Sequence, residues 1–326
     1  MPLSELILIA LLPQAASPCA ECHAAIVSRA AASRHANALQ PIAGSPIAAK
    51  LTAKPLRDQQ GNEFVYRAEP GAVAVSVGGV SALLEWSFGS GAQGFTAVGR
   101  DGTGKWVEHR VSYYPPADRL ARTPGHPAQP VDAAALLGVE QTAANAFRCF
   151  NCHATNVKRV PEGLDLAAAE PGVRCERCHG PGERHTEAAR AKEPITTIRK
   201  AIFNAGKLPP RQIPEVCGEC HRSPTPSVAS ATPELEDPLS IRFQPVGLLA
   251  SFCSQRSGRL SCLTCHDPHE DARHDAAFYA AKCLGCHTAK AKGCPRTPQS
   301  DCLPCHMPRS SPAPFLTFTD HRIRRP

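Results

Sequence analysis

Apolar and polar positions alternate over one part of the chain. Between residues 63 and 114, β-branched and aromatic runs such as EFVYRA, AVAVSV and ALLEWSF are separated by glycine-rich turns, and two prolines follow at 115–116. This pattern predicts a small antiparallel sheet. The 32 prolines of the chain remove backbone donors, so they argue against long helices and wide sheets.

Helical signals in the sequence are short. Residues 20–40 are rich in alanine and contain neither glycine nor proline, which predicts a helix that runs toward His35. A second helix is expected over residues 132–147, with Asp132 as its N-cap. Shorter helices are expected over 183–192 and 271–292, and the proline-rich segments 205–216 and 222–247 are expected to be connectors.

The composition leaves the interior of such a protein short of large side chains. Aromatic residues make up only 5% of the 326 residues, with two tryptophans and four tyrosines. The chain is nevertheless 42% hydrophobic and 20% charged, which is not typical of a disordered protein. Large apolar groups other than side chains are therefore expected to fill the core.

The cysteines indicate what these groups are. Fourteen of the sixteen cysteines form seven C-x-x-C pairs, and a histidine directly follows every pair, in CAECH, CFNCH, CERCH, CGECH, CLTCH, CLGCH and CLPCH. Two thiols at this spacing can add to the two vinyl groups of one porphyrin, and the adjacent histidine then lies under the iron as proximal ligand. A zinc site would leave the histidines unexplained, and a redox dithiol would occur once.

The sequence therefore predicts seven covalently bound haem c groups, numbered here by motif in chain order. The thioether-forming cysteines are Cys19, Cys22, Cys149, Cys152, Cys175, Cys178, Cys217, Cys220, Cys262, Cys265, Cys283, Cys286, Cys302 and Cys305. The proximal histidines are His23, His153, His179, His221, His266, His287 and His306.

These motifs are unevenly spread, with one near the N-terminus and six between residues 149 and 306. We expect mainly short α-helices and irregular loops wrapped around a haem stack, with a small antiparallel β region near 63–114. The expected parts are a signal peptide (1–17), an N-terminal region with haem 1 and the small sheet (18–148), and a hexahaem C-terminal region (149–326).

The second axial ligand of each iron is expected to be histidine, because Met1 and Met307 are the only methionines. Seven histidines lie outside the motifs. His185 and His269 follow their nearest proximal histidines too closely to reach the other face of the same ring, so each is expected to bind a neighbouring iron. The expected distal ligands are His35, His126, His185, His269 and His321, and the weaker candidates are His109 and His274.

His109 occupies a strand position and His274 a charged helical segment, so a structural or surface role is the alternative for both. If neither binds iron, up to two haems are five-coordinate or take another ligand.

Two cysteines, Cys253 and Cys294, lie outside the motifs. In an oxidising compartment we expect a disulfide between them, with free thiols or a link to a partner as the alternatives. Haem c is attached outside the bacterial cytoplasm, and the apolar run at 6–12 with small residues at 15–17 predicts a signal peptide, although Glu5 makes its first part atypical. We therefore expect a periplasmic or secreted protein.

The formal net charge of +7 does not indicate a nucleic-acid partner. Each haem brings two propionates, so the 36 lysines and arginines are expected to offset these carboxylates. We expect no nucleic acid among the partners.

The chain resembles the multihaem c-type cytochromes with doubled CxxCH motifs, a group related to the tetrahaem cytochrome c family. The resemblance lies in CHGPGERH and CHDPH, in CAECHAAIVSRAAASRHA, and in DCLPCHMPR together with FTDHRIR. It implies electron transfer and supports the five expected distal histidines, but it does not clearly support His109 or His274.

We therefore predict a periplasmic or secreted heptahaem c-type cytochrome that carries electrons along a bis-histidine haem chain. Its expected partners are redox proteins, membrane-associated ones among them, and a homo-oligomer or a filament of the same chain is a further reading. The alternative is a multihaem oxidoreductase with one five-coordinate haem that acts on a small nitrogen or sulfur compound. An electron-transfer protein is favoured over an enzyme because it requires no substrate pocket.

Overall fold

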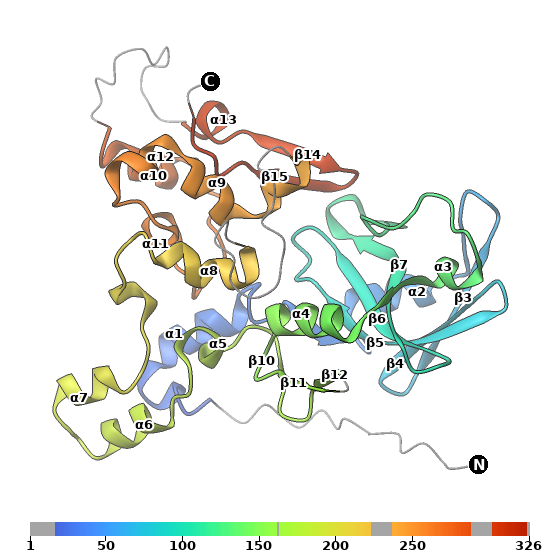
Figure 1. Cartoon of the computed structure of the whole chain (residues 1–326), viewed down its shortest axis with the longest axis horizontal. Coiled ribbons are helices and arrows are strands. Elements are labelled where there is room, and N and C mark those ends of the chain that lie inside the picture. Colours follow the sequence, from blue (N-terminus) through green and yellow to red (C-terminus); the bar gives the residue numbers. More distant parts are fainter. Residues whose placement is uncertain (1–16, 162, 223–236, 288–301, 325–326) are drawn as a thin grey trace. The chain divides into compact units, whose positions relative to one another are not determined.

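The computed structural model describes residues 17–161, 163–222, 237–287 and 302–324 (Figure 1). The chain divides into two compact units, Met1–Arg177 and Cys178–Pro326, and the division falls within the third CxxCH motif. Residues 1–16 of the expected signal peptide lie outside the described residues. Within the described ranges, no helix combines the length and the apolar character needed to cross a membrane.

A curled nine-stranded antiparallel sheet dominates the N-terminal unit (Figure 1). Seven strands run in the order β2-β3-β4-β5-β6-β7-β8, while β1 pairs with β5 and β9 pairs with β7. The strands are β1 (Leu39–Pro41), β2 (Leu56–Arg57), β3 (Glu63–Glu69), β4 (Ala72–Val77), β5 (Val80–Phe88), β6 (Phe95–Asp101), β7 (Trp106–Tyr114), β8 (Arg119–Arg122) and β9 (Gly138–Gln141).

The fold class predicted from the sequence is wrong. We expected mainly short helices and irregular loops with a small β region near 63–114, whereas the sheet is large and its strands extend from residue 39 to residue 141. Strands β3 to β7 fall within the predicted range. The four others have two to four residues each, which is too few for a period-two pattern to stand out in the sequence. Pairing with longer strands, as of β9 with β7, determines their conformation.

One face of the sheet packs into a side-chain core. Val73, Leu84 and Val107 from three strands meet Ile47 and Leu51 of α2 (Pro46–Thr52) in this core. The short helix α3 (Ala133–Leu137) also packs here. Its N-cap is the predicted one, because the Asp132 carboxylate accepts a hydrogen bond from the Ala135 backbone amide at 2.7 Å.

The helix predicted over residues 132–147 is interrupted at Gly138. A Cβ at this position would lie 2.0 Å from the carbonyl oxygen of Glu108, so glycine allows the chain to pass this close to β7. The chain continues as β9 and then forms α4 (Ala143–His153), whose N-cap Thr142 accepts a hydrogen bond from the Asn145 amide at 3.2 Å.

Helix α4 packs on the other face of the sheet. The ring of Phe150 is fully buried, and its centroid lies 5.6 Å from that of Trp86, 5.0 Å from that of Phe88 and 5.2 Å from that of Trp106. This aromatic cluster holds the second CxxCH motif, at the end of α4, against the sheet. The remaining elements of the unit are α1 (Ala20–Ala32), η1 (Pro115–Ala117), β10 (Ala154–Thr155), β11 (Lys158–Val160), β12 (Gly163–Asp165), β13 (Glu170–Pro171) and α5 (Cys175–His179), which crosses the division.

The C-terminal unit is built from short helices and one hairpin. Its elements are α6 (Glu183–Arg190), α7 (Ile195–Lys200), η2 (Ala205–Lys207), α8 (Ile213–His221), η3 (Pro238–Arg242), α9 (Gln244–Ala250), α10 (Phe252–Ser257), α11 (Cys262–Cys265), α12 (Ala276–Leu284), α13 (Leu303–His306), β14 (Arg309–Ala313) and β15 (Leu316–Thr319).

Few apolar side chains are fully buried in this second unit. In its described part the buried hydrophobic residues are Ala188, Ile213, Val246, Leu248, Ala280 and Leu316. These side chains are small or medium in size, and none is aromatic. A core of this kind is sparse for a unit of its length, and it suits a protein whose interior is completed by large apolar groups.

Candidate haem sites

Every CxxCH motif lies on a helical turn or at the end of a helix. The histidine amide donates to the carbonyl of the first cysteine in several of them, with N···O distances of 2.8 Å for His23, 3.0 Å for His266, 2.8 Å for His287 and 3.1 Å for His306. This turn brings the two cysteines and the histidine to one side of the backbone. It is the arrangement that attachment of one porphyrin edge requires.

Oxygen acceptors hold four of the seven motif histidines, which are the predicted proximal ligands, by their Nδ1 atoms. Nδ1 of His153 lies 3.0 Å from the Ala38 carbonyl oxygen, and Nδ1 of His179 lies 2.8 Å from that of Phe203. A carbonyl oxygen can only accept, so Nδ1 carries the proton and Nε2 carries the lone pair that binds a metal. The other two contacts are from His221 Nδ1 to Gln244 Oε1 at 3.0 Å and from His306 Nδ1 to the Arg324 carbonyl at 2.7 Å.

These acceptor residues could not be identified from the sequence. Ala38, Phe203 and Arg324 act through their backbone oxygens, which carry no signal of residue type. Gln244 acts through its side chain, but it lies far from His221 in the sequence, and no neighbouring motif identifies it as a partner of that histidine. Only the folded chain brings these oxygens to the imidazole rings.

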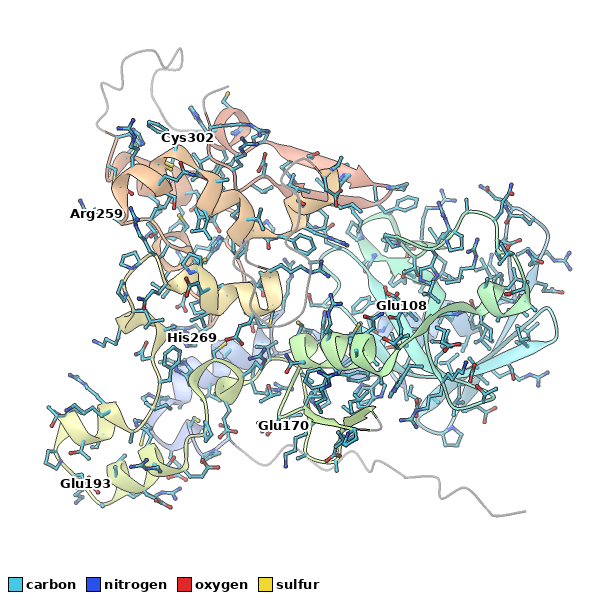
Figure 2. All side chains as sticks on the ribbon, in the orientation of Figure 1. Glu108, Glu170, Glu193, Arg259, His269 and Cys302 are labelled. Carbon is cyan, nitrogen blue, oxygen red and sulfur yellow. The ribbon has the colours of Figure 1, made fainter. Side chains whose placement is uncertain are left out.

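Two of the predicted proximal histidines each face one of the predicted distal histidines. The rings of His179 and His269 are nearly parallel, with an interplanar angle of 10° and centroids 6.1 Å apart. The rings of His266 and His321 have centroids 6.3 Å apart. His269 lies on the loop that follows α11 (Figure 2).

These separations have room for one metal atom between the two rings. A bond between a metal and an imidazole nitrogen is about 2.0–2.1 Å long, so two such bonds in line separate the two nitrogens by roughly 4 Å. The remainder of each centroid separation is the distance from each nitrogen to the centre of its own ring. Nδ1 of His269 lies 2.8 Å from Asp267 Oδ1, and Nδ1 of His321 lies 3.0 Å from the Thr319 carbonyl oxygen. Burial lowers the pKa of His266 and of His321, which favours neutral rings with a free lone pair.

The other predicted distal histidines are in different surroundings. His185, on α6, donates from Nδ1 to the Ile198 carbonyl at 2.8 Å. His35 is exposed in the turn after α1, and His274 is exposed in the segment before α12. His126 is buried, yet neither of its ring nitrogens has a hydrogen-bond partner among the described residues. A buried imidazole of this kind is available to a metal, and the nearest carboxylate oxygen, Glu108 Oε2, lies 3.5 Å from its Nε2.

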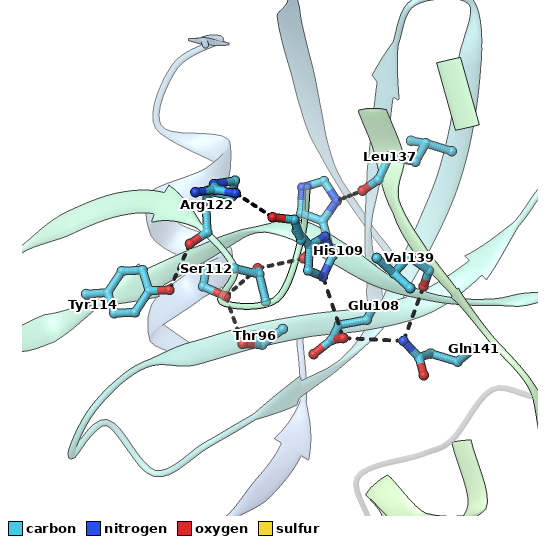
Figure 3. Close-up of polar contacts among 11 residues, drawn as sticks. Thr96, Glu108, His109, Ser112, Tyr114, Arg122, Leu137, Val139 and Gln141 are labelled. Atoms are coloured by element: carbon cyan, nitrogen blue, oxygen red, sulfur yellow. Dashed lines mark hydrogen bonds and ion pairs between the residues drawn. The ribbon is translucent and has the colours of Figure 1, made fainter. Parts of the chain in front are cut away.

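His109 differs from these residues because both of its ring nitrogens have partners. Nδ1 lies 2.7 Å from the Leu137 carbonyl oxygen (Figure 3), and Nε2 lies 2.8 Å from the Tyr66 hydroxyl. The ring is fully buried beside Phe64, and burial lowers its pKa to about 4. His109 therefore has the surroundings of a satisfied core histidine.

The first cysteines of different motifs lie next to one another. The thiols of Cys217 and Cys262 are in contact, and this contact together with burial raises the pKa of Cys262. Cys175 is likewise in contact with Cys19, and burial together with this contact raises its pKa.

A third contact of this kind joins Cys283 to Cys302 at the start of α13 (Figure 2). Burial, followed by the charge and hydrogen bonding of nearby thiols, raises the pKa of Cys283 to about 11. The motifs brought together in this way are 1 with 3, 4 with 5, and 6 with 7.

Cys253 is a half-buried cysteine on α10, near the cysteines of motifs 5 and 6. Its predicted disulfide partner, Cys294, lies outside the described residues. The disulfide therefore stays a prediction.

The described residues thus fit haem c at the level of donor chemistry. Thiol pairs and histidines share helical turns, oriented Nδ1 protons leave Nε2 for a metal, one buried imidazole has no hydrogen-bond partner, and the C-terminal unit has few buried apolar side chains.

The comparisons with known proteins support the same class. The family model "cytochrome c554 and c-prime" matches residues 126–180, which contain His126 and the CFNCH and CERCH motifs. Together with the motifs, this match supports a multihaem c-type cytochrome. A solved structure, the crystal structure of outer cell wall cytochrome OcwA, is similar in fold over 95% of this chain and 79% of that chain, with a TM-score of 0.56 and 13% sequence identity. No curated protein matches the chain.

Proposed function

We propose that this chain is a heptahaem c-type cytochrome that carries electrons along a chain of bis-histidine haems. The observation that carries the proposal is the pair of facing histidines His179–His269 and His266–His321, at 6.1 and 6.3 Å between ring centroids. An iron bound by two histidines has both axial positions filled by protein, which suits electron transfer rather than binding of a substrate.

In this proposal the fourteen motif cysteines hold seven haems by thioether bonds, and the seven motif histidines are the proximal ligands. Each haem supplies an Fe(III)/Fe(II) couple that accepts and passes on one electron. His269 and His321 are the distal ligands opposite His179 and His266, and His35, His126 and His185 are distal ligands elsewhere. His274 is a further candidate, whereas His109 is left in the sheet core.

The oxygens that accept from Nδ1 have a definite role in electron transfer. The carbonyl oxygens of Ala38, Phe203, Arg324 and Thr319 hold their imidazole rings in one orientation and one tautomer. A ring held in this way presents the same Nε2 lone pair in both oxidation states. The protein then needs little rearrangement when an electron arrives or leaves.

The contacts between first cysteines support a dense arrangement of these groups. Cys19 with Cys175, Cys217 with Cys262, and Cys283 with Cys302 bring six of the seven motifs together in pairs. We infer that the haems of motifs 1 and 3, 4 and 5, and 6 and 7 are neighbours.

We propose that the protein acts in the periplasm or outside the cell. The apolar segment before the first motif supports export, and the similar fold of an outer cell wall cytochrome agrees with a secreted protein. The proposed partners are other redox proteins, including membrane-associated ones. Assembly into a homo-oligomer or a filament would extend the same electron path.

Mass spectrometry of the mature protein tests the haem count. We expect the mass of the polypeptide plus seven haem increments. In a variant with Cys262→Ala and Cys265→Ala, one increment should be lost, because the remaining histidine alone does not hold the haem covalently. In the matched control Cys253→Ala, which removes a thiol outside the motifs, all seven should remain. A native mass without haem increments would contradict the proposal.

A further inference from the structure

The C-terminal segment, residues 319–324, contacts the histidines of two different motifs. His321 in this segment faces His266 of motif 5, with ring centroids 6.3 Å apart. At the end of the segment, the Arg324 carbonyl oxygen accepts a hydrogen bond from Nδ1 of His306, the histidine of motif 7, at 2.7 Å. One short stretch of backbone thus reaches the predicted axial ligands of two irons.

Ser251, which lies between α9 and α10, holds the middle of this segment. It is fully buried, and its Oγ accepts a hydrogen bond from the Ile323 amide at 2.8 Å. The same Oγ lies 3.0 Å from the His321 carbonyl oxygen and 3.0 Å from the Gly247 carbonyl oxygen, and its single proton can be donated to either of them. The hydroxyl is therefore in contact with the backbone of the segment at two residues.

Gly247 of α9 allows the segment to lie this close to the helix. A Cβ at this position would lie 2.7 Å from the Arg322 amide nitrogen and 3.0 Å from the His321 carbonyl carbon. These are backbone atoms, so a larger residue would have to displace the segment itself. Gly247 and Ser251 together thus define where the segment lies on α9.

We propose that Ser251 is a positioning residue for two haems, those of motifs 5 and 7. By holding residues 319–324, it keeps His321 opposite the histidine of motif 5. It also keeps the Arg324 carbonyl oxygen on Nδ1 of His306. The inference rests on the proposed function, in which these histidines are axial ligands.

The two haems respond to the segment in different ways. An acceptor at Nδ1 makes a ligating imidazole more basic, and the axial ligands set the reduction potential of a haem. A weaker contact between Arg324 and His306 should therefore raise the potential of haem 7, because it favours Fe(II). A displaced His321 should instead disturb the distal ligand of haem 5. The other five haems should keep their ligands.

An EPR-monitored redox titration of the full-length protein with its haems attached tests the proposal. Haem 5 is identified as the centre that changes from low-spin to high-spin in His321→Gln. Haem 7 is identified as the signal missing from a variant with Cys302→Ala and Cys305→Ala. In Ser251→Ala we expect the low-spin signal of haem 5 to shift. We also expect the potential of haem 7 to rise by about 59 mV, which corresponds to a tenfold change in the equilibrium constant for one electron.

Two further variants separate positioning from a general loss of stability. Gly247→Ala displaces the same segment without removing the hydroxyl, so it should change the same two haems, and it serves also if Ser251→Ala does not fold. The matched control is Ser254→Ala, because this serine on α10 is also buried and, among the described residues, makes no hydrogen bond to residues 319–324. It should leave all seven haems unchanged.

The outcomes distinguish this inference from the proposed function. If His321→Gln adds no high-spin centre, His321 is not a ligand, and the proposed function fails at this iron together with the inference. If it adds one, but Ser251→Ala changes neither haem or only one of the two, the inference is overturned and the electron carrier stands. Equal changes in all haems, or the same changes in Ser254→Ala, would also overturn it, because they indicate a loss of stability.

Discussion

Phe150 lies within the second motif, between the two cysteines that are expected to hold haem 2. Its side chain is fully buried, and three aromatic rings of the sheet, those of Trp86, Phe88 and Trp106, lie 5.0–5.6 Å from it between centroids. Two of these contacts are edge-to-face. Replacing Phe150 with alanine should therefore detach the end of α4 from the sheet.

The expected loss of stability follows from the size of the cavity and the contacts. Truncation of a buried phenylalanine to alanine usually costs about 3–5 kcal/mol. Edge-to-face aromatic pairs add about 0.5–1.5 kcal/mol each beyond the buried area, and the sheet holds the neighbouring rings in place so that they cannot fill the cavity. We expect Phe150→Ala to lower the free energy of unfolding of the N-terminal unit by about 4 kcal/mol, a large part of the roughly 5–15 kcal/mol that is usual for a domain.

Guanidinium chloride unfolding, followed by far-UV circular dichroism, measures this loss. The matched control is Phe252→Ala, because this phenylalanine is 64% exposed and its main contact is the Arg256 guanidinium, 4.9 Å from the ring centroid. An exposed contact of this kind is worth about 0.5–1 kcal/mol. Equal midpoints for the two variants would refute the view that the aromatic cluster docks α4.

Three further predictions concern the core around His109. Gly138→Ala should destabilise the protein by more than about 1 kcal/mol, because the new Cβ would lie 2.0 Å from the Glu108 carbonyl oxygen. The control is Gly102→Ala, whose new Cβ would have no atom within 4 Å. Thermal unfolding compares the stabilities of the two variants. Tyr66→Phe should cost about 1–3 kcal/mol in denaturant unfolding, since it leaves Nε2 of His109 buried without a donor; no change would mean that the hydrogen bond is not formed. Burial lowers the pKa of His109 from 6.5 to about 4, so between these pH values the unfolded chain binds more protons than the folded one. The free energy of unfolding should therefore fall by about 3 kcal/mol as the pH drops from 6.5 to 4. His109→Gln should remove this part of the pH dependence, and identical pH profiles of unfolding for the variant and the parent protein would contradict the prediction.

The sequence predicted the parts of the fold in which each residue's role is visible locally. Strands β3 to β7 lie where alternation is sustained, and α3 begins at the expected cap, Asp132. The predicted helix over 132–147 failed because Gly138 is required by the approach of a distant strand. No residue near Gly138 in the sequence indicates this close contact with the distant strand. The extent of the sheet was missed for the same reason, because β1, β2, β8 and β9 owe their strand conformation to their partners.

The candidate site, like the fold, could be predicted from the sequence only in part. The CxxCH motifs can be read directly, because attachment of one porphyrin edge needs two thiols and a histidine within one turn of helix. The facing of His269 with His179, and of His321 with His266, depends on segments far apart in sequence. That His269 binds an iron other than that of its own motif stays a prediction, and the histidine that it faces could be identified only from the folded chain.

The two units differ in what can fill their interiors, and this explains why the composition was misleading. The few aromatic residues suggested a protein without a conventional core, yet Phe64, Phe88, Phe95 and Phe150 are all buried in the N-terminal unit. The scarcity therefore applies to the C-terminal unit, in whose described part no aromatic side chain is fully buried. A conventional side-chain core holds the sheet together, whereas five of the seven predicted proximal histidines lie in the unit whose core is sparse. An interior completed by haem stays a prediction for the second unit, whereas the sheet core of the first unit is filled by side chains. The composition misled because an average over the chain conceals the difference between the two units.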